Sequence, residues 1–489
     1  MRLATVSIAL AGLSACASAG ASDGGSSTGG TATGTSGGST GQRATGSGSS
    51  TGRAASGGST GAGSTGAGSS SGSSSGGSTG TADAGVRAWP DTSAAIVAFS
   101  DQFDTSSLDA AQMQFAATHY AGAQKLLLSA VQALRAINPG FLLLHYRLGA
   151  ALGYAVPNTN CAPTTQYLQI IDGNQWVQEW PGDSVVQASW FFPYAGSPRV
   201  YDCVGGHYLT ELDDPGWRSW WSAQVIQQME DCTADGLFAD SYSVPNYFGA
   251  TNFQPNLPVD DATFESNWAT LLHDFTDFMR GQFAGQYLWI PNIGSWITTR
   301  DPTDYSNVDG AMMEGFAEGG GGNYYAESDW QLEMNRALSL IGADKKMIMQ
   351  TYPSLSDVGE RMFVLGTYLL VKGAHTYLNL DASGQSLQWM PEYGLDLGAA
   401  TDPLPSDIST LLDATWNVYV RHYANGLVLV NPSGSAQTIA LGGTYYQATP
   451  QGGGPVPSDG SSPGSLTYPA VTSVTLAADT AAVLLASPP

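Results

Sequence analysis

The chain has 489 residues, with 17 Lys and Arg against 41 Asp and Glu, which gives a formal net charge of −24. An acidic surface repels phosphate backbones, so this composition argues against nucleic acid as a partner. The sequence contains neither a CxxC pair nor an HExxH motif, and we therefore expect no metal site and no cofactor.

Residues 1–16 have the features of a bacterial lipoprotein signal peptide. Arg2 precedes an apolar run that ends at Leu13, which is shorter than the roughly 20 residues of a membrane-spanning helix. The following Ser-Ala-Cys sequence resembles a lipobox, in which the cysteine, here Cys16, is acylated and anchors the protein to a membrane. Because Ala17 follows, we expect an anchor in the outer membrane or at the cell surface of the bacterial envelope. An ordinary signal peptide with an incidental cysteine is the alternative.

Residues 17–85 consist almost entirely of Gly, Ser, Thr and Ala. Such a segment cannot bury enough apolar surface to offset the entropy of ordering the chain, so we expect a disordered, flexible tether. Export also places the cysteines in an oxidising compartment. If Cys16 is acylated, one disulfide and one thiol remain, and the sequence leaves open whether Cys203 pairs with Cys161 or with Cys232.

Residues 86–415 alternate short apolar runs with longer stretches of helical periodicity, which predicts an α/β fold of (β/α)₈ TIM-barrel type. The competing fold is a doubly wound open sheet, but no GxGxxG lies between a predicted strand and a helix. The predicted strands are Ala95–Phe103, Gln114–His119, Phe141–Arg147, Gly236–Ser241, Tyr287–Asn292, Gly310–Phe316, Lys346–Tyr352 and His375–Leu380. Helices are predicted for Gln124–Ile137, Trp217–Glu230 and Asp261–Arg280.

Each predicted strand begins with apolar residues and ends with polar or aromatic ones. The carboxyl ends of barrel strands form the active-site face, so we expect these residues to meet there. They are Asp101, His119, His145 with Arg147, Asp240, Asn292, Glu314, Tyr352 and Asn379.

A segment of about 65 residues, from about 150 to 215, is too long for a simple loop and is rich in aromatic residues, among them Trp176, Trp180 and Trp190. We expect it to cover the active-site face as a lid or a wall of the substrate site. Trp190, together with Trp296 after the fifth strand, would stack on sugar rings; ordinary core packing is the alternative for each. Residues 416–489 look entirely β, and we expect a small sandwich with a structural or accessory binding role.

Asp240 and Glu314 interrupt apolar strands, where a lone carboxylate is costly to bury unless it has partners or a task. Glycosidic bond cleavage needs one protonated acid and one carboxylate that faces the anomeric carbon or its water. We expect Asp240 to act as nucleophile or base and Glu314 as proton donor, because the apolar neighbours of Glu314 would raise its pKa. Alternatively, one of the two binds only a substrate hydroxyl or a barrel neighbour.

The other strand-end residues are expected to bind sugar hydroxyls, and Asp101 serves as a reserve carboxylate. Asp235 begins its strand and should lie at the opposite end of the barrel from the chemistry. A four-glycine stretch, Gly319–Gly322, follows Glu314 and could act as a gate or be simply slack. The expected substrate-binding residues are Asp101, His119, Tyr120, His145, Arg147, Trp190, Asn292, Trp296, Tyr352 and Asn379.

Several of these segments resemble a known family. Thr118-His-Tyr-Ala-Gly-Ala-Gln-Lys125, Asn138-Pro139, Asp235-Gly-Leu-Phe-Ala-Asp240 and the Glu314 strand resemble the hypothetical glycosyl hydrolase barrels, most closely number fifteen of that series. The resemblance covers about residues 95–400 and the general layout of the region that follows. The DGxxxD strand is also similar to α-galactosidase-like and dextranase-like barrels, where an aspartate ending strand four is the nucleophile. This resemblance implies that role for Asp240 and implies less for Glu314, because those families differ in the position of the acid.

The resulting prediction is a monomeric, surface-tethered glycoside hydrolase that cleaves O-glycosidic bonds of a polysaccharide or oligosaccharide. A catalytically inactive, glycan-binding lipoprotein is the main alternative, although it would not need a matched pair of acids. A polysaccharide lyase ranks last, because only Arg147 among the strand-end residues could neutralise a uronate.

Overall fold

The computed structural model describes residues 87–153, 170–171, 176–177, 181, 184–382 and 386–489. The predicted signal peptide with Cys16, the predicted linker of residues 17–85, Cys161 and Trp180 lie outside the described residues. The barrel and the C-terminal sheets belong to one compact unit.

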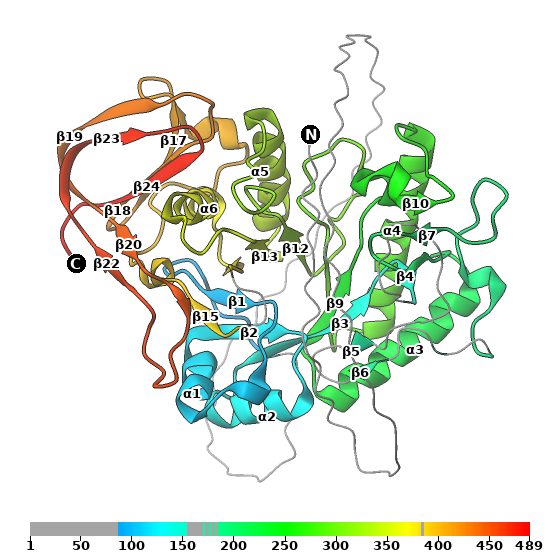
Figure 1. Ribbon diagram of the computed structural model, residues 1–489. Helices are drawn as coiled ribbons and strands as arrows, with labels where there is room; N and C mark the ends of the chain where they lie inside the picture. Colours follow the sequence, from blue (N-terminus) through cyan, green and yellow to red (C-terminus); the bar gives the residue numbers. More distant parts are fainter. Residues whose placement is uncertain (1–86, 154–169, 172–175, 178–180, 182–183, 383–385) are drawn as a thin grey trace, which may run out of the picture. The chain divides into compact units, whose positions relative to one another are not determined.

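Eight parallel strands form the barrel (Figure 1). Seven neighbouring pairs are joined by parallel pairing. A parallel bridge between Asn292 and Met312 closes the sheet between its two edge strands, reinforced by the hydrogen bond from Ile293 N to Met312 O. The strands are β1 (Ala98–Ser100), β2 (Tyr120–Gln124), β3 (Leu142–Leu148), β9 (Gly236–Asp240), β11 (Leu288–Pro291), β12 (Gly310–Glu314), β13 (Lys346–Thr351) and β14 (Thr376–Leu380).

Alternate residues of each strand face the barrel interior or the surrounding helices. In β3, Leu142, Leu144 and Tyr146 belong to the interior cluster, whereas Leu143 packs in the outer layer. The helices are α1 (Ala110–His119), α2 (Leu128–Ile137), α3 (Pro215–Cys232), α4 (Ala262–Phe283), α5 (Glu327–Gly342) and α6 (Val358–Val371). Within the described part of the chain, no helix is both long and apolar enough to cross a membrane.

The second strand differs from the prediction. Residues Gln114–His119 belong to α1, and the strand is Tyr120–Gln124. Asp109 begins the helix with a capping box, in which its side chain accepts from the Gln112 backbone while the Gln112 side chain accepts from the Asp109 backbone. This cap fixes the start of α1 and moves the strand toward the C-terminus. The next helix therefore begins at Leu128, later than predicted.

The segment between β3 and α3 contributes part of a small antiparallel sheet to the structure. Cys203 lies in a disulfide whose partner cysteine is outside the described residues, whereas Cys232 on α3 is a buried thiol. The pairing of Cys203 with Cys232 is thus ruled out. The sheet consists of β4 (Ala151–Leu152), β7 (Tyr201–Asp202), β8 (Tyr208–Leu209) and β10 (Phe253–Gln254), and a separate pair is formed by β5 (Ile170–Ile171) and β6 (Trp176–Val177).

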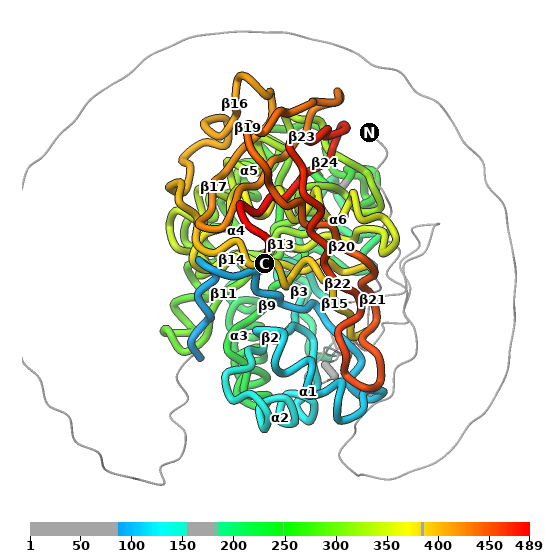
Figure 2. The backbone as a smooth tube through the Cα atoms, turned by 90° about the vertical axis from the view of Figure 1, so that its left-hand side faces the viewer, coloured from blue at the N-terminus to red at the C-terminus, as the bar shows by residue number. Residues whose placement is uncertain are grey.

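The C-terminal strands form the expected antiparallel sandwich, which packs on α6 (Figure 2). A Cβ atom at Gly366 of α6 would lie only 2.5 Å from Cβ of Ala481, so glycine permits this close approach. The sheet begins at Leu412, slightly before the predicted boundary of 416. Its strands are β16 (Leu412–Asp413), β17 (Val418–Tyr423), β18 (Gly426–Asn431), β24 (Thr480–Leu485), β19 (Gln437–Gln447) and β23 (Ala470–Leu476).

Candidate active site

Asp240 and Glu314 lie close together at the carboxyl end of the barrel. Asp240 is the last residue of β9 and Glu314 the last residue of β12, the fourth and sixth strands along the barrel. The side-chain nitrogen of Asn292, which follows β11 between them, donates to Asp240 Oδ1 at 2.8 Å and to Glu314 Oε2 at 2.5 Å. Since both oxygens bond to one nitrogen, they are at most about 5.3 Å apart, which is less than the separation of about 6.5–9.5 Å typical of an inverting glycosidase pair.

Three neutral donors surround the Asp240 carboxylate. Besides Asn292, the hydroxyl of Tyr146 donates to Oδ2 at 2.8 Å, and the backbone N–H of Ser241 donates to Oδ1 at 2.8 Å. Ser241 adopts a left-handed backbone with a φ of 56°, which is uncommon for a residue other than glycine. This left-handed residue after β9 directs its backbone N–H at the carboxylate of the preceding residue, Asp240.

Glu314 is the first member of a chain of hydrogen bonds across the last three strands. The Tyr352 hydroxyl donates to Glu314 Oε1 and accepts from Gln350 Nε2 at 2.7 Å. Asn379 Nδ2 in turn donates to Gln350 Oε1 at 2.9 Å. Burial and the nearby charge of Asp240 raise the pKa of Glu314, although the hydrogen bonds from Tyr352 and Asn292 lower it.

Asp101 and Lys125 form an ion pair beside this cluster, following β1 and β2. Lys125 Nζ lies 3.0 and 3.1 Å from the two oxygens of Asp101, and 4.9 Å from the centre of the Tyr146 ring. Burial alone would lower the pKa of Lys125, but the charges of Asp101, Asp240 and Glu314 raise it. Lys125 was not among the expected site residues, because the predicted second strand ended six residues before it.

His119 and Tyr120 do not reach the carboxylates. His119 ends α1, where its ring stacks on Phe115 at a centroid distance of 3.7 Å. Tyr120 begins β2, packs in the outer layer, and donates its hydroxyl to the backbone oxygen of Gln388. Both lie where β2 starts, whereas Lys125 follows its end, so the expectation that they bind substrate at the barrel mouth is corrected.

His145 and Arg147 also lie outside the mouth. Both are buried and point from β3 toward α3, where His145 Nε2 and Arg147 Nη1 contact Oε1 of Gln228 at 3.1 and 2.8 Å. The alternation of β3 places Tyr146, between them, in the interior. The sequence indicated the correct strand but assigned the chemistry to its outward-facing residues.

The two tryptophans expected to stack on sugars are packed against protein instead. Trp190 is 1% exposed, and its ring centroid lies 4.9 Å from that of Trp220 on α3. Trp296 is 7% exposed, with Tyr305 at 5.0 Å and the Arg336 guanidinium at 4.6 Å from its ring. Core packing, the alternative considered for each, therefore describes both residues.

The glycine stretch after Glu314 is held by two acidic side chains. Glu318 Oε2 accepts from the backbone N–H groups of Gly320 and Gly322, and Glu360 Oε1 accepts from Gly322 as well. Gly321 N donates to the backbone oxygen of Tyr352 at 3.1 Å. The loop is thus fixed by hydrogen bonds to Tyr352, which directly follows β13, and is not the loose segment considered as one alternative.

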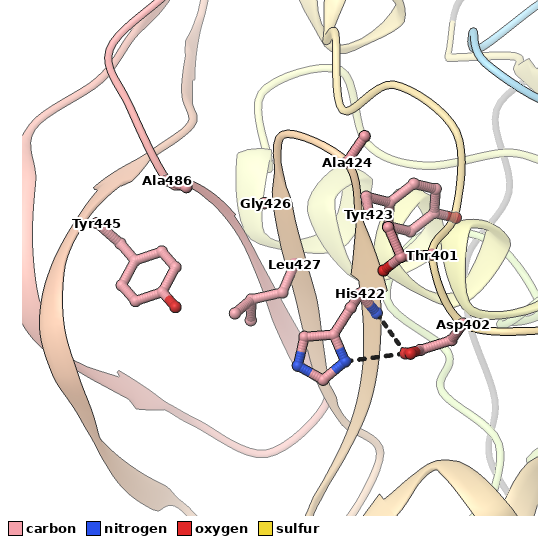
Figure 3. A pocket seen from close by; sticks show the side chains of 9 residues that line it. All are labelled: Thr401, Asp402, His422, Tyr423, Ala424, Gly426, Leu427, Tyr445 and Ala486. Atoms are coloured by element: carbon pink, nitrogen blue, oxygen red, sulfur yellow. Dashed lines mark hydrogen bonds and ion pairs between the residues drawn. The ribbon is translucent and has the colours of Figure 1, made fainter.

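The described residues contain no group of three or more His, Cys, Asp or Glu side chains arranged to hold a metal ion. A pocket of about 450 Å³ lies on the C-terminal sandwich and contains none of the expected site residues (Figure 3). There His422 donates to Asp402 Oδ2 from its backbone N–H at 2.7 Å, and its Nδ1 lies 2.9 Å from the same oxygen.

No curated protein matches the chain, but several solved structures are similar to it. A cycloisomaltooligosaccharide glucanotransferase from Paenibacillus sp. is 10% identical with a TM-score of 0.32, and the match covers 80% of this chain and 55% of that one. A maltogenic α-amylase from Thermotoga neapolitana is 9% identical with a TM-score of 0.35, covering 79% of this chain and 98% of that one. A cycloalternan-forming enzyme from Listeria monocytogenes is 11% identical with a TM-score of 0.36, covering 82% of this chain and 42% of that one.

A family model described as hypothetical glycosyl hydrolase family 15 matches residues 135–427, which is more than half of the chain. The matched region includes Asp240, Asn292, Glu314 and Tyr352. The chain belongs to hypothetical glycosyl hydrolase family 15.

Proposed function

We propose that the protein is a retaining glycoside hydrolase in which Asp240 is the nucleophile and Glu314 the acid/base. The observation that carries this proposal is the single amide group of Asn292 between the two carboxyl groups, which limits their nearest oxygens to a separation of about 5.3 Å. Retaining glycosidases hold their carboxyl groups about 5–5.5 Å apart, whereas inverting enzymes need about 6.5–9.5 Å to admit a water.

In the first step, Glu314 gives its proton to the glycosidic oxygen while Asp240 attacks the anomeric carbon. The bond to the leaving group breaks, and a glycosyl ester on Asp240 forms. In the second step, water attacks the anomeric carbon and releases Asp240, and Glu314 takes the proton of that water. Two inversions at the anomeric carbon give a product of retained configuration.

The surroundings of each carboxyl group support its role. Burial and the charge of Asp240 raise the pKa of Glu314, which favours the protonated form that the first step requires. Asp240 accepts hydrogen bonds from Tyr146, Asn292 and the backbone of Ser241. An acceptor with three donors suits a group that attacks as an anion.

We propose a polysaccharide or oligosaccharide as the substrate and Cys16 as the site of a lipid anchor at the bacterial cell surface. A catalytic domain on a long Gly/Ser/Thr-rich tether could then search a polymer near the membrane. Metabolic labelling with a radioactive fatty acid tests the anchor. Label in the native chain and none in the Cys16→Ser variant is the expected result, and equal label in both would contradict it.

A glycan library tests the activity. Wild type should hydrolyse at least one glycan, and Asp240→Asn and Glu314→Gln should lose that activity while they remain folded. Asp402→Asn, an equally small change at the pocket on the sandwich, serves as the control and should retain full activity. Full activity in either of the first two variants would overturn the assignment.

Azide can distinguish the two roles. With an activated substrate, azide should rescue Asp240→Gly and yield a glycosyl azide of inverted configuration, because azide replaces the missing nucleophile. In Glu314→Ala, azide should instead intercept the glycosyl ester and yield retained configuration. The opposite pattern would exchange the two roles.

A further inference from the structure

Lys125 is a cation beside the catalytic pair that the two-step reaction does not use. It follows β2 with a left-handed backbone, φ 50°, which is a conformation that residues other than glycine adopt at a cost. Its ammonium group contacts both oxygens of Asp101 at 3.0 and 3.1 Å.

The position of the ammonium group links it to the nucleophile. Lys125 Nζ lies 4.9 Å from the Tyr146 ring centre and 5.5 Å from that of Phe238, and the Tyr146 hydroxyl donates to Asp240 Oδ2 at 2.8 Å. The Lys125 side chain is 22% exposed. A cation in such a shielded position acts on neighbouring charges much more strongly than it would in water.

We propose that Lys125, fixed by Asp101, is a positioning residue that sets the ionisation of the catalytic pair. This inference rests on the proposed roles of Asp240 and Glu314. Burial and the charge of Asp240 raise the pKa of Glu314, and the Lys125 cation lowers it, so that the proton on Glu314 remains easy to transfer. Asp101 opposes this effect as an anion and fixes where the cation lies.

Other titratable groups face the same space. Tyr146 reaches it from β3 and Tyr352 from β13, and the charge of Asp381, which follows β14, also acts on Tyr352. Burial raises the pKa of Tyr352 well above its ordinary value, so this hydroxyl is neutral over the working pH range. Tyr146 and Tyr352 donate hydrogen bonds to the two catalytic carboxyl groups, and Lys125 with the acidic residues supplies the charges.

The pH–rate profile tests the proposal with two substitutions of opposite sign. Lys125→Met removes a cation that lies near both catalytic carboxyl groups and should move both limbs of the kcat/KM profile to higher pH by about one unit. Asp101→Asn removes an anion and should move both limbs to lower pH. Lys125→Arg keeps the charge and should leave the limbs within a few tenths of a unit.

Lys345→Met is a matched control, since Lys345 precedes β13 and so lies at the opposite end of the barrel. A purely structural role for Lys125 would lower the rate without shifts of opposite sign. The proposal would be overturned if the kcat/KM profiles of Lys125→Met and Asp101→Asn superimposed on that of wild type. It would also be overturned if both profiles moved in the same direction.

A second measurement needs no substrate. The difference in unfolding free energy between wild type and Glu314→Gln reports the titration of Glu314, because a pKa raised by folding stabilises the native state only at low pH. This difference should fall as pH rises, and the fall should extend to higher pH in the Lys125→Met background. Unmoved curves would refute the inference. Moved curves with no hydrolysis of any glycan would refute the proposed function alone.

Discussion

Two aspartates, Asp235 and Asp240, lie at opposite ends of strand β9. Asp235 directly precedes the strand and is 1% exposed; Arg87 and Arg135 pair with its two oxygens at 2.9 and 2.8 Å, and Leu143 N donates to it at 2.8 Å. Asp240 ends the strand and accepts hydrogen bonds from three neutral donors. The cation nearby, Lys125, is paired with Asp101.

This contrast shows how one strand can serve two purposes. At the amino end, two guanidinium groups neutralise the Asp235 carboxylate. These ion pairs link the segment before β1, which carries Arg87, to helix α2, which carries Arg135. At the carboxyl end, neutral donors orient the Asp240 carboxylate, and the Lys125 cation is ion-paired with Asp101 rather than with Asp240. The division agrees with the general rule that the bottom of such a barrel provides stability and the top provides chemistry.

The largest expected effect is on catalysis at the carboxyl end. Asp240→Asn should lower kcat/KM by about 10³-fold or more, because the step that forms the glycosyl ester is lost. Its free energy of unfolding should change by no more than about 1 kcal/mol, since the amide keeps most of the acceptor contacts. Steady-state kinetics with a urea titration measure both quantities, and a variant that is inactive only because it is unfolded would break the comparison.

The reverse pattern is expected at the amino end. Asp235→Asn breaks a buried ion pair with two arginines and should cost about 3 kcal/mol of unfolding free energy. The kcat of the folded fraction should stay close to that of wild type. A urea titration and active-site-normalised kinetics test this, and a large loss of kcat in folded protein would mean that the two ends are not separate in function.

Tyr352→Phe should sharpen the assignment of Glu314. The tyrosine hydroxyl donates to Glu314 and lowers its pKa against the effect of burial. Removing it should lower kcat by about tenfold, and it should move the alkaline limb of the profile to higher pH. A shift of that limb to lower pH would show that Glu314 is not the group that must be protonated.

The smallest effect concerns the loop beyond the site. Burial and the charge of Glu360 raise the pKa of Glu318 to about 7. Because the folded pKa lies above the unfolded one, this group stabilises the fold fully below about pH 4.3 and loses that contribution as pH rises through 7. Glu318→Gln should therefore flatten the decline in melting temperature between pH 5 and 8, and an unchanged decline would refute the role of this carboxyl group.

Much of the barrel follows from the sequence. Seven of the eight predicted strands overlap the observed ones, since strand-length apolar runs and their polar ends are visible without tertiary information. The closeness of Asp240, Asn292 and Glu314 followed from the same reasoning, because the carboxyl ends of parallel barrel strands share one face.

The errors have two physical causes, of which the first was visible in the sequence and the second was not. The capping box at Asp109 begins α1, so the residues predicted as the second strand form the end of that helix. The observed strand lies further along the chain, and the prediction therefore missed Lys125 at its carboxyl end. In β3, we expected His145 and Arg147 at the mouth of the barrel. Both instead point outward and contact Gln228 of α3. Only the packing partner of a strand determines which of its two faces lies inward.

The configuration of the first product tests the central claim most directly. Proton NMR during hydrolysis of an active glycan can identify the anomer before it equilibrates in water. We expect the same anomeric configuration in product and substrate, because Asn292 holds one oxygen of each carboxyl group within about 5.3 Å of the other, which is less than the gap of about 6.5–9.5 Å that admits a water in inverting enzymes. A first product of inverted configuration would contradict it.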